Sequence, residues 1–306
     1  MKKYKGKRYG RPPKKRSRFL LPAIILLVLA LMGILAISSR NSSEVDEPPV
    51  LAEAGATDGE SAGQERPADP VTGATTTSEK PKFETLEMPT ETPSPARVLR
   101  VPILMFHHTG EPPADADELR KGLTVSTTDL ESQLGYLRQA GYHPVTEAQL
   151  FNALFNGAEL PPKPVMLTFD DGYIDNFQVA APILEKYNFP ATFYIITDKV
   201  GTPEFMTWDQ ISDLDRRGMD IGSHTATHQD LTVLSAANLS TELSGAADTL
   251  KSKLGHPVYW LCYPAGKYDA DVLKYASEAG YLLATTTEPG ERQSSEAPLA
   301  GRKSGG

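Results

Sequence analysis

The sequence predicts an α/β fold, specifically a distorted or incomplete (β/α) barrel of about seven units. From about Val98 onward, short apolar runs alternate with longer helix-like segments, which is typical of βα units joined into a parallel sheet. Runs such as PVMLTF at 164–169 are continuously apolar, as expected of strands buried on both faces. An open doubly wound sheet is the alternative. In either fold the chemistry belongs at the C-terminal ends of the strands.

The individual elements follow from apolar runs and from capping signals at their ends. The expected strands cover 101–108, 142–145, 164–169, 190–196, 219–224, 258–264 and 281–287. The expected helices begin at capping residues or end near glycine, and they cover 126–140, 147–155, 176–187, 207–217, 235–254 and 269–279. After Pro289 the chain ends in SSEAPLAGRKSGG. This segment has no strand pattern, so we expect the last strand of the barrel to be missing.

Four regions are expected along the chain. Residues 1–18 hold ten of the 31 Lys and Arg residues and no acid, and they predict a basic cytoplasmic tail. Residues 19–37 carry no charge and nearly cover a hydrocarbon core of roughly 30 Å. They predict a transmembrane signal-anchor, with a cleaved signal peptide as the alternative. Residues 38–98 have no apolar period and predict a disordered linker, and 99–306 form the folded domain.

The charge distribution bears on location and partners. Positive charge before an apolar span stays cytoplasmic, which places the folded domain outside the cell and makes the membrane a partner. Beyond residue 18 the chain carries 21 basic and 39 acidic residues. A nucleic-acid enzyme concentrates basic charge on its folded part, so we expect no nucleic-acid partner. The sequence does not indicate an oligomeric state.

Three polar clusters follow expected strands. Asp170 and Asp171 come directly after 164–169, His224 and His228 after 219–224, and the turn Tyr263-Pro264-Ala265-Gly266 after the strand near 260. Each cluster has an ordinary interpretation by itself: an Asp-Gly turn, two surface histidines in a Thr-rich loop, and a turn that ends a strand. Together, one carboxylate and two imidazoles make a three-ligand site with open positions, as in catalytic metal centres. The second carboxylate is then left to act as a base.

TFDDG, HTATH and the YPAG turn, in this order, resemble the polysaccharide deacetylases of carbohydrate esterase family 4, the NodB-homology domain. The wider pattern includes VPILMFHH, FPATFYI and MTWDQI, and it looks most like the poly-N-acetylglucosamine deacetylase branch. The resemblance implies that Asp171, His224 and His228 bind a divalent metal, most often Zn²⁺, with Co²⁺ or Ni²⁺ as alternatives. It implies that Asp170 is the general base toward the attacking water.

The resemblance also implies the remaining roles. The backbone N–H of Ala265 would help to hold the oxyanion, and Tyr263, Pro264 and Trp208 would contact substrate. The alternative interpretation of Trp208 is an aromatic residue of the core or of a helix start, with no role in substrate binding. Met105-Phe106-His107 matches the segment that supplies the general acid in this branch, so His107 is assigned to that role. His108 is the alternative acid, and a buried structural histidine is the other interpretation.

Two features depart from the family pattern. Cys262 stands where many members have an Arg that pairs with the catalytic Asp, which leaves the tuning of Asp170 unexplained. The second departure is at the C-terminus. The family usually has a final strand there, but residues 290–306 lack the apolar residues of such a strand. A lost edge strand would expose backbone groups on its neighbour.

The function that the resemblance implies is metal-dependent removal of N-acetyl groups from an extracellular N-acetylglucosamine polymer, either peptidoglycan or poly-N-acetylglucosamine. One alternative is an O-acetyl esterase acting on xylan or a similar polymer. The other is a non-catalytic cell-wall glycan-binding protein with a decayed site, which the unusual C-terminus motivates.

Overall fold

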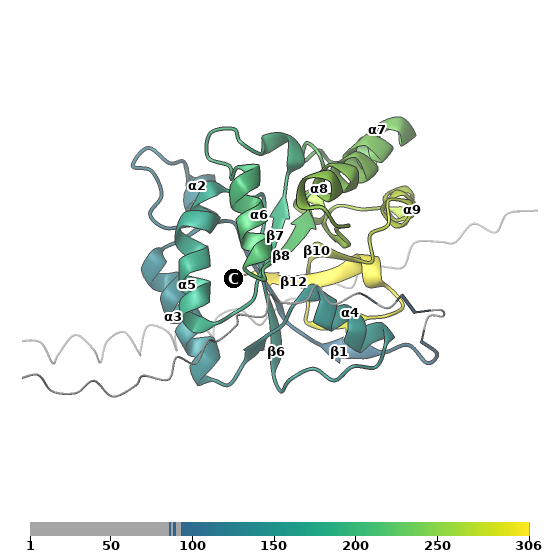
Figure 1. Cartoon of the computed structure of the whole chain (residues 1–306), viewed down its shortest axis with the longest axis horizontal. Coiled ribbons are helices and arrows are strands. Elements are labelled where there is room, and N and C mark those ends of the chain that lie inside the picture. Colours follow the sequence, from purple (N-terminus) through teal and green to yellow (C-terminus); the bar gives the residue numbers. More distant parts are fainter. Residues whose placement is uncertain (1–85, 87, 90–92, 306) are drawn as a thin grey trace, which may run out of the picture. The chain divides into compact units, whose positions relative to one another are not determined.

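The computed structural model describes residues 86, 88–89 and 93–305 (Figure 1). The predictions for 1–18, for 19–37 and for nearly all of 38–98 therefore lie outside the described residues. Within the described part of the chain, no helix is both long enough and apolar enough to cross a membrane.

Seven parallel strands form a nearly closed barrel. Their order around the barrel is β2, β12, β10, β9, β8, β7 and β6, and β2 pairs back onto β6. Their bounds are β2 Ile103–Phe106, β6 Pro164–Phe169, β7 Thr192–Ile195, β8 Asp220–Ser223, β9 Trp260–Cys262, β10 Leu283–Pro289 and β12 Gly301–Gly305. The pairing of β2 with β6 distinguishes this barrel from an open doubly wound sheet, and the barrel prediction is confirmed.

Short strands add to the barrel at its margins. β5 (His143–Pro144) pairs with the first two residues of β6. β3 (His108–Thr109) pairs with β4 (Thr124–Val125). β1 (Val98–Arg100) pairs antiparallel with β11 (Arg292–Ser294), a ribbon that the sequence pattern did not predict.

The prediction for the C-terminus was wrong, because Gly301–Gly305 form β12 between β10 and β2. The side chain of Gln293 makes hydrogen bonds to the backbone of Arg302 in β12, as a neighbouring strand would. Its Oε1 accepts from Arg302 N at 3.1 Å, and its Nε2 donates to Arg302 O at 3.1 Å. The same Nε2 also donates to Val101 O at 3.0 Å. A Cβ on Gly301 would lie 2.9 Å from Ala284 O. Backbone pairing and close approach, rather than apolar side chains, therefore define this strand.

The helices follow their predicted caps closely. Ser126 Oγ accepts from Asp129 N at 3.0 Å at the start of α3, and Thr146 and Thr207 form capping boxes at α4 and α6. The bounds are α2 Glu118–Gly122, α3 Thr127–Gln139, α4 Glu147–Phe155, α5 Ala181–Tyr187, α6 Trp208–Arg216, α7 Ala236–Ser240, α8 Ala246–Leu254 and α9 Ala270–Glu278. A π-helical turn at 176–180 precedes α5, and another at 241–245 joins α7 to α8.

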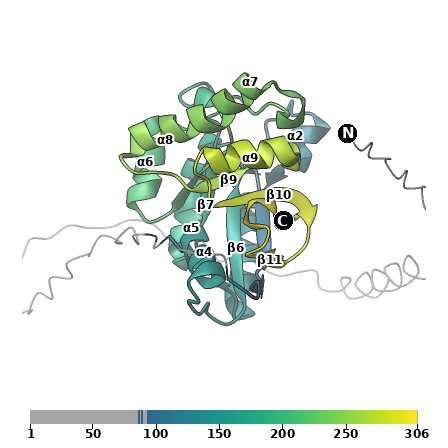
Figure 2. The same ribbon diagram turned by 90° about the vertical axis from the view of Figure 1, so that its right-hand side faces the viewer.

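The core determines which end of the barrel is open. Side chains of α4 pack with Ile103, Met166, Trp260 and Leu283 from the first part of their strands, so α4 covers the N-terminal end. A second core cluster joins α3, α5 and α6 to the sheet, and a third joins α7 and α9 to β9 and β10. The ribbon views show helices around the strands of the barrel (Figures 1 and 2). The C-terminal ends of the strands are left to the loops.

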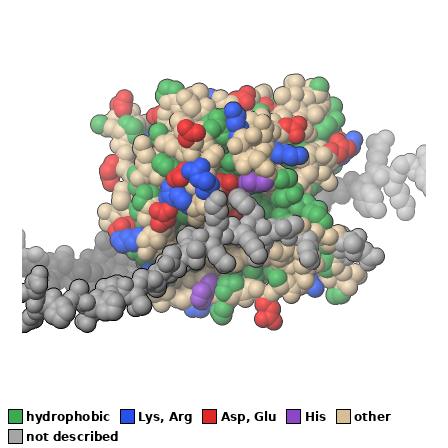
Figure 3. Space-filling model, in the orientation of Figure 1, with side chains coloured by type: hydrophobic (Ala, Val, Ile, Leu, Met, Phe, Trp, Pro, Cys, Tyr) green, Lys and Arg blue, Asp and Glu red, His purple; other side chains and the backbone are tan. Residues whose placement is uncertain are grey.

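The surface carries both signs of charge. On the face in Figure 3, acidic and basic side chains are interspersed over the described part. Exposed ion pairs such as Lys186 with Glu131 at 3.0 Å and Lys121 with Glu118 at 3.0 Å are of this kind. Such exposed pairs contribute little to stability, so the fold depends on its core and on the barrel pairing.

Candidate active site

The predicted polar residues gather at the C-terminal ends of the barrel strands. Asp170 and Asp171 follow β6, His224 follows β8, and His107 follows β2. Neighbouring parallel strands end at one edge, so residues from distant parts of the chain meet there. Asp170, Asp171 and His224 are all buried, with at most 8% of their surface exposed.

Asp171, His224 and His228 form a cluster with the geometry of a metal site. Asp171 Oδ1 lies 3.3 Å from His224 Nε2 and 3.5 Å from His228 Nε2, and the three potential ligand atoms all lie within 4.8 Å of one another. Asp171 Oδ1 is buried and has no hydrogen-bond partner among the described residues. A buried carboxylate oxygen without a partner is costly, and a cation held by the two imidazoles would satisfy it.

The second nitrogen of His224 fixes its tautomer. Nδ1 donates to the carbonyl oxygen of Cys262 at 2.7 Å, which leaves the lone pair of Nε2 directed at the cluster. Metal-ligating histidines commonly donate their other ring N–H to a carbonyl in this way. One carboxylate and two imidazoles suit a divalent ion of the zinc type, so the residues present fit the metal that the resemblance implies.

The backbone at this cluster adopts conformations that are unfavourable for most residues. The φ angle is 75° at Asp171, 67° at Thr225 and 65° at His228. Thr225 Oγ1 accepts from His228 N at 3.1 Å, and the Glu242 carboxylate accepts from Thr227 N at 2.9 Å. Left-handed non-glycine residues cost free energy and gather at functional sites, and here these hydrogen bonds hold the loop that carries His228 in place.

Asp170 is paired with Lys303, a residue that the sequence analysis missed. Lys303 Nζ lies 2.6 Å from Oδ1 and 2.7 Å from Oδ2 of Asp170, and both residues are buried. Burial, the largest single effect, would raise the pKa of Asp170, but the Lys303 ammonium acts together with His224 and His107 to bring that pKa below its usual value. Cys262 Sγ completes the group, at 3.2 Å from Lys303 Nζ and 3.4 Å from Asp170 Oδ2.

Lys303 therefore supplies the cation that the Arg-to-Cys departure seemed to remove. The small Cys262 side chain at the end of β9 leaves room for a lysine that arrives from β12. The signal in the sequence was the departure itself: a buried catalytic carboxylate without its arginine needs another cation. Residues 290–306 offer three, Arg292, Arg302 and Lys303, of which both arginines are exposed.

The two adjacent histidines after β2 have different surroundings. His108 is buried, its Nδ1 lies 2.8 Å from Asp175 Oδ2, and its Nε2 is hydrogen-bonded to Arg120. Both of its nitrogens are thus engaged, which favours the structural interpretation for His108. His107 is half-buried; burial lowers its pKa, and the carboxylates of Asp170 and Asp171 oppose that effect. His107 thus lies within electrostatic range of the centre, and its assignment as the acid stays a prediction.

The residues of the YPAG turn that were predicted to contact substrate differ in exposure: two have buried side chains, and one is exposed. Tyr263 and Pro264 are buried, and the Tyr263 hydroxyl donates to Leu299 O at 3.0 Å, so these side chains stabilise the turn. Ala265 is exposed with φ at 53°, and a Cβ on Gly266 would lie 2.1 Å from Thr287 Oγ1. The turn thus presents backbone at Ala265, and its role at an oxyanion stays a prediction.

Trp208 lies at the first position of α6. It is half-buried, packs against the core cluster of α3, α5 and α6, and has Lys253 Nζ 5.7 Å from its ring centre. These contacts favour the packing interpretation that the sequence left open for this residue.

The site combines a candidate metal-binding triad with an ionised carboxylate and a nearby imidazole. Such a set can activate a water molecule, polarise a carbonyl and protonate a leaving group. Acyl transfer to water, from an amide or an ester, needs these three functions.

Similarity to known proteins agrees with this chemistry. Residues 157–284 match the model of the polysaccharide deacetylase family. The Bacillus subtilis protein YxkH, named as a polysaccharide deacetylase, is 30% identical over 191 residues, which cover 62% of this chain and 66% of that protein. The poly-beta-1,6-N-acetyl-D-glucosamine N-deacetylase of Escherichia coli is 33% identical over 138 residues, which cover 40% of this chain and 20% of that protein.

Solved structures show the same relationship. The Streptococcus pyogenes deacetylase PplD, in complex with acetate, superposes with a TM-score of 0.63 at 29% identity, over 68% of this chain and 93% of the other. A polysaccharide deacetylase from Bacillus cereus gives a TM-score of 0.60 at 28% identity, over 68% and 65%. IcaB from Ammonifex degensii shares the fold, with a TM-score of 0.58 at 24% identity, over 66% and 90%. By sequence, fold and site, the chain belongs to the polysaccharide deacetylase family, the NodB-homology or carbohydrate esterase 4 group.

Proposed function

We propose that this protein removes N-acetyl groups from an extracellular polymer of N-acetylglucosamine, in a reaction that depends on a divalent metal. The observation that carries the proposal is the adjacency of the triad Asp171, His224 and His228 to the buried Asp170–Lys303 pair. The match to poly-N-acetylglucosamine deacetylases supports an amide substrate. Poly-N-acetylglucosamine and the glycan strands of peptidoglycan are the two polymers proposed.

The residues divide the reaction between them. Asp170 takes a proton from the attacking water, whose oxygen forms a bond to the acetyl carbon. The N–H of Ala265 donates to the developing oxyanion. His107 then gives a proton to the amide nitrogen as the carbon–nitrogen bond breaks, so that acetate and a free amine leave.

Asp171, His224 and His228 would hold the ion, with Zn²⁺ proposed and Co²⁺ or Ni²⁺ as alternatives. When bound, the divalent ion would lower the pKa of the attacking water and polarise the acetyl carbonyl. In this proposal Asp170 stays outside the ligand set, because its charge is already compensated by Lys303.

The location is proposed from the N-terminal sequence. The basic tail at 1–18 and the apolar span at 19–37 support a single-pass anchor with the deacetylase domain outside the cell. An extracellular domain would meet acetylated polysaccharide directly. A cleaved signal would give a secreted enzyme with the same substrate.

The alternative of a decayed, non-catalytic site no longer has the observation that supported it. It was based on the unusual C-terminus, which instead forms β12 and delivers Lys303 to the centre. An O-acetyl esterase would use the same groups, since an ester is the easier of the two acyl substrates.

The test is acetate release by the full-length protein, purified in detergent and loaded with Zn²⁺. We expect release from β-1,6-linked N-acetylglucosamine oligomers or from peptidoglycan glycan strands, and at least tenfold slower release from acetylated xylan. Faster release from xylan would favour the esterase. No release from any of these substrates with Zn²⁺, Co²⁺ or Ni²⁺ would refute the proposed reaction.

A further inference from the structure

A column of buried polar side chains runs through the barrel beneath Asp170. Lys303 is its first member, Tyr194 on β7 its second, and Glu147 at the start of α4 its third. All three are at least 98% buried. The column thus leads from the reacting end of the barrel to the end that α4 covers.

The Lys303 ammonium rests on the face of the Tyr194 ring. Its Nζ lies 4.8 Å from the ring centre, while its hydrogen bonds go to Asp170 and to Cys262 Sγ. An aromatic face carries negative potential and attracts a cation at this distance, most strongly where water is excluded. The ring therefore holds the ammonium on the side opposite the carboxylate.

Tyr194 is itself held at two places. A Cβ on Gly222 would lie 2.3 Å from Tyr194 Cδ1, so the ring lies close against the backbone of β8. The Tyr194 hydroxyl donates to the Glu147 carboxyl, and it accepts from Thr285 Oγ1 at 3.4 Å. The ring has little freedom to tilt or withdraw from Lys303.

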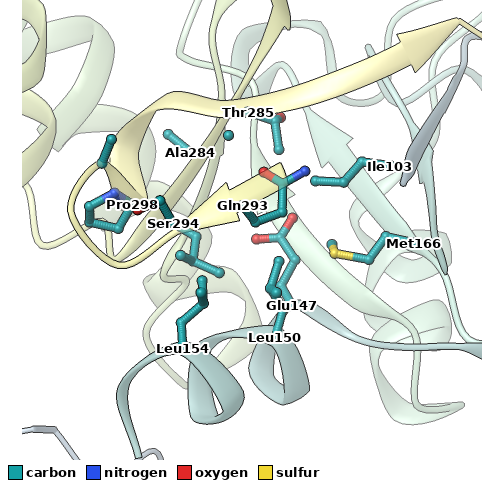
Figure 4. A pocket seen from close by; sticks show the side chains of 13 residues that line it. Ile103, Glu147, Leu150, Leu154, Met166, Ala284, Thr285, Gln293, Ser294 and Pro298 are labelled. Atoms are coloured by element: carbon teal, nitrogen blue, oxygen red, sulfur yellow. The ribbon is translucent and has the colours of Figure 1, made fainter. Parts of the chain in front are cut away.

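Glu147 completes the column without drawing Lys303 away from Asp170. Figure 4 shows its carboxyl group facing a cavity, together with Gln293 and Thr285, and its Oε2 has no hydrogen-bond partner among the described residues. Burial raises the pKa of Glu147 well above its usual value. The hydrogen bonds of Lys303 Nζ go to both oxygens of Asp170, so Asp170 is the carboxylate that Lys303 pairs with in the column.

We propose that Tyr194 is a positioning residue of the deacetylase, which uses its ring face to hold the Lys303 ammonium against Asp170, with Glu147 fixing the ring from below. The proposal rests on the role proposed above for Asp170. It predicts that the electron density of the ring at position 194 affects turnover, although this ring is too deeply buried to contact substrate.

The test changes the ring face and leaves its size almost unchanged. Full-length protein with Tyr194→Phe keeps an electron-rich ring but loses the hydroxyl that donates to Glu147, so it serves as the reference for the change of the ring face. Incorporating 3,4,5-trifluorophenylalanine at the same position withdraws electrons from the face. We expect kcat at least fivefold below that of Tyr194→Phe, with KM unchanged within twofold.

Phe193 provides the matched control on the same strand. It is also fully buried, but it stacks on Phe169 with ring centres 5.1 Å apart in another core cluster. The trifluoro analogue at Phe193 should leave kcat within twofold, and thermal melting of every variant checks folding. Equal kcat for the trifluoro analogue and Tyr194→Phe at position 194 would overturn the positioning role. Absence of acetate release by the native protein would instead refute the proposed function.

Discussion

Asp170 and Lys303 are the residues on which the chemistry of this site most depends. The ammonium keeps the buried carboxylate ionised, because it lowers the pKa of Asp170 against the effect of burial. A carboxylate with a low pKa is a weak base. A weak base is sufficient where a bound metal brings the pKa of the attacking water toward 7. The Asp170–Lys303 pair is therefore compatible with the proposed metal triad.

Replacing Lys303 by Met should leave Asp170 buried without its partner. We expect a loss of about 3 kcal/mol in the free energy of unfolding at pH 8. In the native protein, the lowered pKa of Asp170 contributes stability that is fully present above the unfolded value near 3.8 and is lost only below it. In the variant, burial raises the pKa of the unpaired Asp170, so this carboxylate takes up a proton and its cost is relieved as the pH falls from 8 toward 4. The gap between native and variant should therefore narrow toward pH 4, as urea unfolding at several pH values would show.

Lys303→Arg is the matched control, since it keeps the positive charge and should lose less than half as much stability at pH 8. A gap between native protein and Lys303→Met that does not change with pH would show that the loss comes from packing rather than from the ion pair.

At the level of elements, β12 shows how a strand can form without an apolar pattern. Its residues read GRKSG, and sequence patterning cannot distinguish such a segment from a tail. The strand forms because both of its backbone edges are paired and Gln293 binds the backbone of Arg302. Its inward lysine is paired by Asp170, 133 residues away in the chain, a contact that no local signal reveals.

Gly301 tests this account of β12. A Cβ at Gly301 would lie 2.9 Å from the carbonyl oxygen of Ala284, so Gly301→Ala must push β12 away from β10. We expect a loss of about 1 to 3 kcal/mol in the free energy of unfolding. Gly245→Ala is the control, because a Cβ there would lie 4.0 Å from the Thr241 methyl group, an ordinary contact. Equal stability of Gly301→Ala and the native protein would contradict the close packing of β12.

Asp220, at the junction between β8 and α4, is a second buried carboxyl group whose ionisation affects stability. Asp220 Oδ2 accepts from Glu147 N at 2.8 Å, and burial raises the pKa of Asp220 to about 6. Between about pH 4 and 6 the folded protein binds more protons than the unfolded chain, so ionisation of Asp220 reduces stability as the pH rises.

Asp220→Asn should remove that cost and keep the acceptor for Glu147 N. We expect the variant to match the native protein near pH 4 and to exceed it by roughly 1 to 3 kcal/mol at pH 7 to 8, as thermal or urea unfolding would measure. Asn at the exposed Asp115 should change stability little at either pH. A native protein more stable than Asp220→Asn at pH 8 would contradict the assignment.

For the whole molecule, the sequence was sufficient for the barrel and for the order of its polar clusters. Apolar runs and caps predicted six of the seven barrel strands, because these depend on local pattern. Residue types at strand ends also predicted that Asp171, His224 and His228 would lie together, as they do; their binding of a metal stays a prediction. Lys303, the closure by β12 and the β1–β11 ribbon depend on contacts between distant segments, which periodicity does not encode.

The barrel also explains why this centre tolerates an unusual residue set. Cys262 and Lys303 come from strands on either side of β10, and together they occupy the space beside Asp170. A lysine on one strand can thus take the place of an arginine on another strand, because in the closed barrel the inward side chains of both strands reach Asp170. We therefore expect Cys262→Arg by itself to bring two cations to one carboxylate and to destabilise the protein rather than restore a family pattern.

The most direct test of the central claim combines metal removal with loss of the base. Full-length protein is stripped with a chelator, reloaded with Zn²⁺ and assayed for acetate release from N-acetylglucosamine oligomers beside Asp170→Asn. We predict that stripping abolishes release, that Zn²⁺ restores it, and that Asp170→Asn binds one equivalent of Zn²⁺ with at least a hundredfold lower kcat. Undiminished release by the stripped protein, or loss of Zn²⁺ binding in Asp170→Asn, would contradict the division between the metal triad and the base.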